Sequence, residues 1–489
     1  MTALAPDIGA DLAAPSARGR RLLGGAALLL LTRLVGLAMG LTVMVLSART
    51  LGPQRFGTFA FALALVQIGM SVTDLGLGAL LVREGAAAPD QLHSLLAWCI
   101  RTRALTGALV AAVLAVIAVA SIPAGDRRVA ALLIIATLPV TAFWLGFNAL
   151  QHFGLLRRLA WLLFAQSVAW LGVVGWLAAR HAGLVAFALA YLIYSICYAA
   201  LVHLVAHRSV RTASQPVRAG AFWRLLRGVV PLSATVVLIA VYYRLDSVFV
   251  YRLSGPEAAG AYAVAYRFLD QAHALPITLS AVFLPLLSAE RAAKRPTAPV
   301  FTRYLRVSLL TSVPCVAVGL IVAKPLVLRV FGPDFQSSVV LLRLLLLSFV
   351  PICVGYVLGQ VAIVHHQSRR QLAAAALALV VNVTLNSIYI PLYGPRAAAV
   401  ITLVTEIAVS MCIYLTLRTP CGLQLPLAWL ARLSAVTLLA GTVGILLMRH
   451  PWVAAPAFTV AFVVLGLRLR LLDATEIRLL LPSSRRHST

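Results

Sequence analysis

Long apolar runs restrict what this chain can fold into more than any other feature. Runs of twenty or more apolar residues recur from Leu22 almost to the C-terminus. Each is long enough to cross a hydrocarbon core of about 30 Å as an α-helix. The composition agrees, because 62% of the 489 residues are hydrophobic and 11% are charged, whereas soluble domains are about 45–50% apolar and about 25% charged. The sequence therefore predicts an all-α polytopic membrane protein.

Charges, prolines and turn residues divide the chain into fourteen candidate transmembrane spans. Their ranges are about 22–46, 57–81, 104–122, 129–149, 159–179, 183–205, 229–251, 260–288, 307–328, 338–364, 371–392, 396–417, 426–447 and 452–467. The first run extends to Leu46, beyond the roughly 7–15 apolar residues of a signal-peptide core. We therefore interpret it as an uncleaved first helix, and the even number of spans places both termini on one side.

The basic residues are distributed unequally across the predicted membrane. With the N-terminus in the cytoplasm, 27 of the 41 Lys and Arg residues lie on the cytoplasmic side and 10 on the opposite side. This excess follows the positive-inside rule, so we predict that both termini are cytoplasmic. It also accounts for the net charge of +27 without a nucleic-acid partner, because basic cytoplasmic loops face anionic lipid headgroups.

Two stretches of the sequence form an internal repeat. The chain reads "RTLGPQRFGTFAFA" from Arg49 and "RLSGPEAAGAYAVA" from Arg252, and Gly-Pro recurs in "VFGPDF" and "LYGPRA". Glycine allows the backbone to turn, and proline presets the φ of a following first helical turn. A duplication of six spans returns corresponding turns to the same side, so we predict a parallel repeat of helices 1–6 and 7–12, with helices 13 and 14 appended.

Three longer segments resemble a known family. They are "SARTLGPQRFGTFAFALALVQIGMSVTDLGLGALLVREGA" at 47–86, "PLSATVVLIAVYYRLDSVFVYRLSGPEAAGAYAVAYRFLD" at 231–270 and "NVTLNSIYIPLYGPRAAAVITLVTE" at 382–406. In order and over nearly the whole chain, they resemble bacterial polysaccharide transporters of the O-antigen (Wzx-like) flippase type, within the multidrug/oligosaccharidyl-lipid/polysaccharide exporter superfamily. The resemblance implies two six-helix lobes in a V around a central cavity. It also implies passage of an undecaprenyl-pyrophosphate-linked oligosaccharide from the cytoplasmic to the outer leaflet of the bacterial inner membrane.

The spans and the repeat together predict the domain organisation. We expect a cytoplasmic N-terminal tail at 1–21, an N-lobe at 22–205, a basic cytoplasmic linker at 206–228, a C-lobe at 229–417, helices 13 and 14 at 418–467, and a basic cytoplasmic tail at 468–489.

Charged residues inside the predicted spans are the candidate functional residues, because a charge at the bilayer centre costs about 2.5–3.5 kcal/mol and normally faces a cavity or a partner. Eight such residues occur: Arg33, Asp74, Arg244, Asp246, Arg267, Asp270, Arg343 and Glu406. At 1.5 Å per residue, the arginines at 244, 267 and 343 lie roughly 8–11 Å below the outer surface, and Arg33 lies near the midplane.

The four arginines have two interpretations. In the first, Arg33, Arg244, Arg267 and Arg343 bind the pyrophosphate of the substrate, because the guanidinium fork suits phosphate oxygens. In the second, they are structural: Arg244 pairs with Asp270, Arg267 pairs with Asp246, and Arg343 extends toward the interface.

The acidic residues are candidates for ion coupling or gating. Arg244 and Asp246 point about 200° apart on one helix, so each needs a partner elsewhere. The resemblance implies a sodium site of hard oxygen donors formed by Asp246, Asn382, Asn386 and Thr402; hydrogen bonds that only pack the helices are the alternative.

Proton coupling through Glu406 or Asp270 is a further alternative. The remaining acid, Asp74, lies in "TDLGLG", where we expect a structural or gating role. We expect no cofactor, and coupling to either a proton or a sodium gradient stays open.

The leading hypothesis is a flippase that works by alternating access in exopolysaccharide, capsule or O-antigen biosynthesis. The alternatives are a lipid II flippase or a multidrug exporter of the same superfamily, and, from a different class, a membrane glycan polymerase or glycosyltransferase. We disfavour the enzymes because no external loop exceeds roughly fifteen residues. The expected partners are the lipid-linked oligosaccharide, membrane lipids, and a polysaccharide polymerase with its chain-length regulator.

Overall fold

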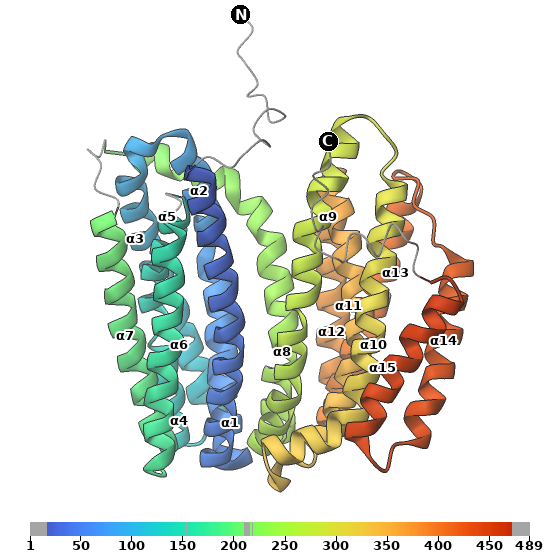
Figure 1. The fold of residues 1–489 in the computed structure, drawn as a ribbon. Coiled ribbons are helices and arrows are strands. Elements are labelled where there is room, and N and C mark those ends of the chain that lie inside the picture. The colour runs from blue at the N-terminus through green and yellow to red at the C-terminus, as the bar shows by residue number, and fades with distance from the viewer. Residues whose placement is uncertain (1–16, 153–154, 210–215, 218, 472–489) are drawn as a thin grey trace, which may run out of the picture. The chain divides into compact units, whose positions relative to one another are not determined.

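The computed structural model describes residues 17–152, 155–209, 216–217 and 219–471, and Figure 1 shows these as a set of long helices. The chain divides into two compact units. Unit 1 comprises Met1–Leu51 and Leu65–Ser233, and unit 2 comprises Gly52–Ala64 and Ala234–Thr489. Most of the two predicted tails and the middle of the predicted linker lie outside the described residues.

Unit 1 is built from the first seven helices and the start of the eighth. The helices are α1 (Ala17–Asp74, without its 52–64 segment), α2 (Leu77–Ala87), α3 (Leu92–Ser121), α4 (Asp126–Ile135), α5 (Gly146–His152), α6 (Leu156–Ala179) and α7 (Leu184–Ser209), with 3₁₀ turns at Pro89–Gln91 and Pro139–Leu145. Leucines of α2 and α3 form a buried cluster with Phe222 and Leu226. This cluster holds the start of α8 (Ala219–Ala272) against unit 1.

Unit 2 is organised around one central helix. Its helices are the rest of α8, α9 (Ala274–Ala292), α10 (Ala298–Val330), α11 (Ser338–Val364), α12 (Ser368–Tyr393), α13 (Pro395–Arg418), α14 (Leu427–Leu446) and α15 (Pro451–Arg468), with a 3₁₀ turn at Pro333–Phe335. The central helix is α11, which packs against α9, α10, α12 and α13. The last two helices, α14 and α15, pack against each other and against α10 (Figure 1).

The predicted number of spans is confirmed. Twelve continuous helical segments of the described residues are long and apolar enough to cross a membrane. Two of them, in α1 and α8–α9, each join two helices across a non-helical glycine, Gly52 and Gly255. When each of these is counted as two crossings, the described residues hold the fourteen spans that the sequence predicts.

Some predicted spans are interrupted where the sequence suggested one helix. Pro139 begins a 3₁₀ segment within the predicted span 129–149, because proline cannot donate the backbone hydrogen bond of a continuing α-helix. Leu75 and Gly76 have positive φ, which separates α1 from α2 within the predicted span 57–81. The predicted linker is helical at both ends, since α7 extends to Ser209 and α8 begins at Ala219.

The four Gly-Pro turns of the sequence adopt one backbone conformation. All four Gly-Pro turns place the glycine at positive φ with an extended ψ, and the pairs of φ and ψ are 69° and 169° at Gly52, 88° and 172° at Gly255, 101° and 171° at Gly332, and 63° and −151° at Gly394. This conformation strongly favours glycine, and the following proline opens the next helical segment.

The two long copies of the repeat also contact each other reciprocally. A Cβ atom built on Gly57 would lie 1.7 Å from the carbonyl oxygen of Pro256, and one built on Gly260 would lie 2.2 Å from that of Pro53. The glycine of each copy therefore faces the proline carbonyl oxygen of the other copy, as expected for a local two-fold arrangement. The backbones cross so closely that only glycine fits at either position.

Candidate functional site

A buried polar cluster joins α8, α12 and α13 around Asp246. The amide nitrogen of Asn386 donates hydrogen bonds to Asp246 Oδ1 and to Asn382 Oδ1, each at 2.8 Å. Thr402 Oγ1 donates to Asp246 Oδ2 at 2.8 Å, and the Tyr262 hydroxyl approaches the same oxygen at 3.4 Å. The structure thus brings together the four residues that the sequence suggested for a sodium site, and adds Tyr262.

The charge of Asp246 is not balanced by a basic side chain in this cluster. Asp246 is 2% exposed, and within the described residues no Lys, Arg or His lies within ion-pair distance of it. Two further polar atoms, Asn382 Nδ2 and Asn386 Oδ1, are buried without a hydrogen-bond partner in the described part of the chain. A buried carboxylate is costly unless a cation or a proton neutralises it. Carboxylate, amide and hydroxyl oxygens suit a hard cation, so these residues fit a sodium ion.

A second polar cluster combines two arginines with one aspartate. Arg244 Nη2 lies 3.1 Å from both carboxylate oxygens of Asp270, and the Arg244 guanidinium lies 5.4 Å from the ring centroid of Tyr266. Arg267 lies close enough to interact electrostatically with both Arg244 and Asp270, and its Nε is buried with no acceptor among the described residues. The cluster therefore carries one more positive than negative charge, with donor capacity left over on Arg267.

These contacts test the two ion pairs of the structural interpretation. The pair of Arg244 with Asp270 is confirmed. The pair of Arg267 with Asp246 is wrong, because Asp246 turns toward Asn386 and Thr402 instead. The predicted divergence of Arg244 and Asp246 is confirmed, since each finds its partners on different helical segments.

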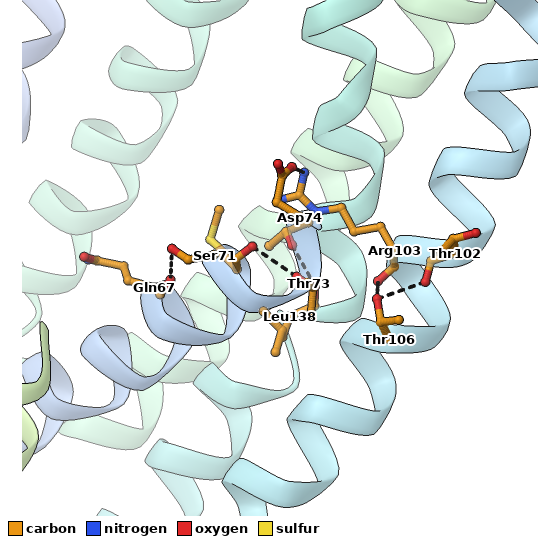
Figure 2. A network of polar contacts seen from close by, with 10 residues as sticks. Gln67, Ser71, Thr73, Asp74, Thr102, Arg103, Thr106 and Leu138 are labelled. Carbon is orange, nitrogen blue, oxygen red and sulfur yellow. Dashed lines mark hydrogen bonds and ion pairs between the residues drawn. The ribbon is translucent and has the colours of Figure 1, made fainter. Parts of the chain in front are cut away.

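A second ion pair lies in unit 1 and involves Arg103, which was not among the candidate residues. Figure 2 shows the Arg103 side chain of α3 extending to Asp74 at the end of α1, with Nη1 and Oδ1 3.1 Å apart. The Arg103 side chain is 9% exposed and that of Asp74 is 39% exposed. Arg103 lies just before the predicted span 104–122, whereas the helix α3 that contains it begins at Leu92. The apolar residues 95–100 that precede it were the signal that α3 begins earlier, at Leu92.

A buried glutamate faces a cavity of unit 2. Glu406 of α13 is 5% exposed, and the phenol groups of Tyr242 and Tyr243 lie against its carboxylate. The cavity measures about 220 Å³ and is bounded by α8, α11, α12 and α13. Its polar lining residues are Tyr242, Tyr243, Tyr356, Gln360, Gln371, Glu406 and Ser410.

Comparison with protein families identifies the group to which the chain is related. A family described as "Polysaccharide biosynthesis protein" matches residues 45–340, which is more than half of the chain. The chain belongs to this family. A search of curated protein sequences finds no match.

Solved structures show which fold this polysaccharide biosynthesis protein adopts. The structure titled "Lipid II flippase MurJ, inward closed conformation" has a TM-score of 0.69 at 13% identity and covers 91% of this chain and 99% of its own. An inward-facing multidrug resistance MATE family transporter of the MOP superfamily has a TM-score of 0.66 at 12% identity, covering 78% and 94%. A point mutant of the Vibrio cholerae MATE transporter VcmN has a TM-score of 0.52 at 17% identity, covering 82% and 97%.

The chain is therefore a member of a polysaccharide biosynthesis family, with helices long and apolar enough to cross a membrane many times and a fold similar to those of the MurJ flippase and of MATE transporters.

The four arginines that the sequence predicts to bind substrate lie in three separate places. Arg244 and Arg267 meet at Asp270. Arg343 is half-buried on α11, and Arg33 is exposed on α1 in unit 1; neither has an ion pair within the described residues.

Proposed function

We propose that this transporter moves an undecaprenyl-pyrophosphate-linked oligosaccharide from the cytoplasmic to the outer leaflet of the bacterial inner membrane by alternating access. The product would serve exopolysaccharide, capsule or O-antigen biosynthesis. The observation that carries the proposal is the cluster of Arg244, Arg267 and Asp270, which holds a surplus positive charge within membrane-spanning helices of a polysaccharide biosynthesis protein.

The chemistry of this cluster suits a diphosphate. Guanidinium groups bind phosphate oxygens through paired N–H donors, and charge-assisted hydrogen bonds are stronger where water is scarce. Asp270 holds Arg244 in place before substrate arrives, and Arg267 Nε, which has no acceptor among the described residues, remains available. A diphosphate would compete with Asp270 for the two arginines, so binding and release stay reversible.

Arg33 and Arg343 are the other arginines that we assign to substrate binding. Both lie in membrane-spanning helices without an ion pair among the described residues. An unpaired cation in an apolar environment gains most from an anionic ligand. We also propose the orientation given by the positive-inside count, with both termini in the cytoplasm.

We propose further that a sodium ion bound by Asp246, Asn382, Asn386 and Thr402 couples transport to an ion gradient. The ion would supply the positive charge that the buried Asp246 carboxylate lacks. These residues hold α8 against α12 and α13, so occupancy of the site changes how tightly the three helices pack. Polysaccharide polymerase and a chain-length regulator are the protein partners that this function requires next.

The decisive experiment is to delete the gene and identify the glycan that accumulates. We expect undecaprenyl-linked repeat units trapped on the cytoplasmic face, with loss of the surface polysaccharide. Accumulation of lipid II would instead support a lipid II flippase, and unaltered glycans with increased drug sensitivity would support a multidrug exporter. Either of these results would overturn the proposal.

Variants of the arginine cluster test the site. At equal expression, we expect Arg244→Ala and Arg267→Ala to reduce export by more than about tenfold, because each removes a charge-assisted contact. Asp270→Asn should retain more export than either arginine variant, because both guanidinium groups remain and the amide oxygen can still accept a hydrogen bond from Arg244. Arg432→Ala, on the exposed face of α14, is the matched control and should export normally.

A further inference from the structure

The cavity beside Glu406 extends from the middle of unit 2 to one end of it. Gln360 and Ile363 line it near the C-terminal end of α11, and Gln371 lines it near the start of α12. Glu406 lies eleven residues after the first residue of α13, close to mid-membrane. The cavity therefore runs from the turn between α11 and α12 to the Glu406 carboxylate. The proposed topology places this turn on the cytoplasmic side.

Glu406 is the only acidic residue among the described residues that line this cavity. In the described ranges of the chain, no Arg or Lys lies within ion-pair distance of it. The aromatic faces of the tyrosines and the two glutamine amides offer a cation further weak contacts along the wall. A buried carboxylate that opens to such a cavity attracts a cation from it.

The Asp246 cluster lies one helical turn beyond Glu406. Thr402, which donates to Asp246, precedes Glu406 by four residues on α13, a rise of about 6 Å. On α8, Tyr242 precedes Asp246 by the same four residues. The two acids thus follow one another along the same pair of helices, with Glu406 on the cavity side.

A buried hydrogen bond lies between the two acids. The Tyr242 hydroxyl donates to Thr405 Oγ1 at 2.9 Å, and Tyr242 and Thr405 are 8% and 1% exposed. Tyr242 lines the cavity on one side. The Tyr242 phenol lies close enough to both Glu406 and Asp246 to interact electrostatically with each, so this hydrogen bond lies on the path from one acid to the other.

We propose that this cavity is the route by which sodium reaches and leaves the Asp246 site. Glu406 is an intermediate cation-binding residue on the route, and the hydrogen bond between Tyr242 and Thr405 is the barrier before the final site. This inference rests on the proposed sodium site. It predicts that substitutions that fill the cavity change the rate of sodium exchange more than the affinity of the Asp246 site for sodium.

The experiment measures ²²Na⁺ binding and exchange on the purified full-length protein in lipid nanodiscs. Ala375→Trp fills the cavity from α12, and Val380→Trp, on the exposed face of the same helix, is the matched control. We expect the first to slow exchange by about tenfold or more with a dissociation constant within about threefold of wild type. The second should exchange at the wild-type rate.

Two conservative variants keep the test informative if tryptophan is not tolerated. Tyr242→Phe removes the barrier hydrogen bond, so exchange should become about 3–10-fold faster with affinity little changed. Glu406→Gln should slow exchange because it removes the intermediate charge.

The possible failures are distinguishable. Wild-type exchange rates in Ala375→Trp and in both conservative variants would overturn the route while leaving the Asp246 site intact. Full sodium binding by Asp246→Asn, or no sodium binding by the wild-type protein, would overturn the site of the proposed function and the route together.

Discussion

At the scale of single residues, the charged side chains inside the protein are of two kinds. Some have an oppositely charged partner within the protein, and others have none and are candidates for binding a ligand. Arg103 and Arg244 each have an aspartate at 3.1 Å. Asp246 and Glu406 are more deeply buried than either arginine, but their hydrogen-bonding neighbours in the described part of the chain are neutral. Because an uncompensated buried carboxylate destabilises the folded state, the two acids are where a cation would have most effect.

Asp246 should make the stability of the protein depend on sodium. Replacing it by Asn keeps the size and removes the charge, so thermal stability in sodium-free buffer should be equal to or higher than that of wild type. A ligand that binds only the folded protein raises its melting temperature. We expect NaCl, compared with KCl, to raise the Tm of wild type and to leave that of Asp246→Asn unchanged. An equal sodium shift in both proteins would contradict the assignment.

The ion pair of Arg103 with Asp74 should respond unequally to removal of its two partners. Asp74→Asn leaves the buried Arg103 cation unpaired, whereas Arg103→Met leaves a carboxylate that is 39% exposed. We therefore expect Asp74→Asn to lower stability more, by up to about 3 kcal/mol. Thermal unfolding in detergent measures the difference. A greater loss in Arg103→Met would show that packing of the arginine side chain, rather than its charge, matters most.

At the scale of secondary-structure elements, glycine and proline decide where helices turn, break and cross. The four Gly-Pro turns adopt one backbone conformation, and their repetition was visible in the sequence. The reciprocal contact of Gly57 with Pro256 and of Gly260 with Pro53 was not. Sequence indicates that a small residue is present, but only the packed helices show which backbone approaches it.

The helix crossing should not tolerate a side chain. In Gly57→Ala the added Cβ would meet the Pro256 carbonyl oxygen at 1.7 Å, and in Gly260→Ala it would meet that of Pro53 at 2.2 Å. A backbone oxygen cannot rotate away as a side chain can, so both variants should lower the Tm, and Gly57→Ala should lower it more. Gly172→Ala on α6 has open space around it and should be neutral or slightly stabilising. Equal Tm values for all three would contradict the close crossing.

At the scale of the whole molecule, charge distribution and span number are the basis of the proposed topology. With fourteen spans the chain would return to its starting side, and the excess of basic residues predicts that this side is cytoplasmic. The fold is similar to those of the MurJ flippase and of MATE transporters. A shared fold does not identify the substrate, because specificity resides in the residues of the site.

Reporter fusions should confirm the orientation. Green fluorescent protein fused after Arg468 at the end of α15 should be fluorescent, and alkaline phosphatase at the same point should be inactive. Fusions at Arg449, between α14 and α15, should give the reverse. The opposite pattern at both positions would invert the topology, and with it the cytoplasmic end of the Glu406 cavity.

The sequence by itself determined the membrane class, the number of spans, the positions of the Gly-Pro turns and the set of charges that need a partner. These follow from hydropathy, turn residues and helical phase, which are local properties of the chain. Family resemblance added the group of Asp246, Asn382, Asn386 and Thr402. Only the tertiary structure decided that Arg244 pairs with Asp270, that Arg103 is buried, and that Glu406 faces a cavity. Helical phase fixes the direction of a side chain on its own helix, but the packing of neighbouring helices determines what it meets.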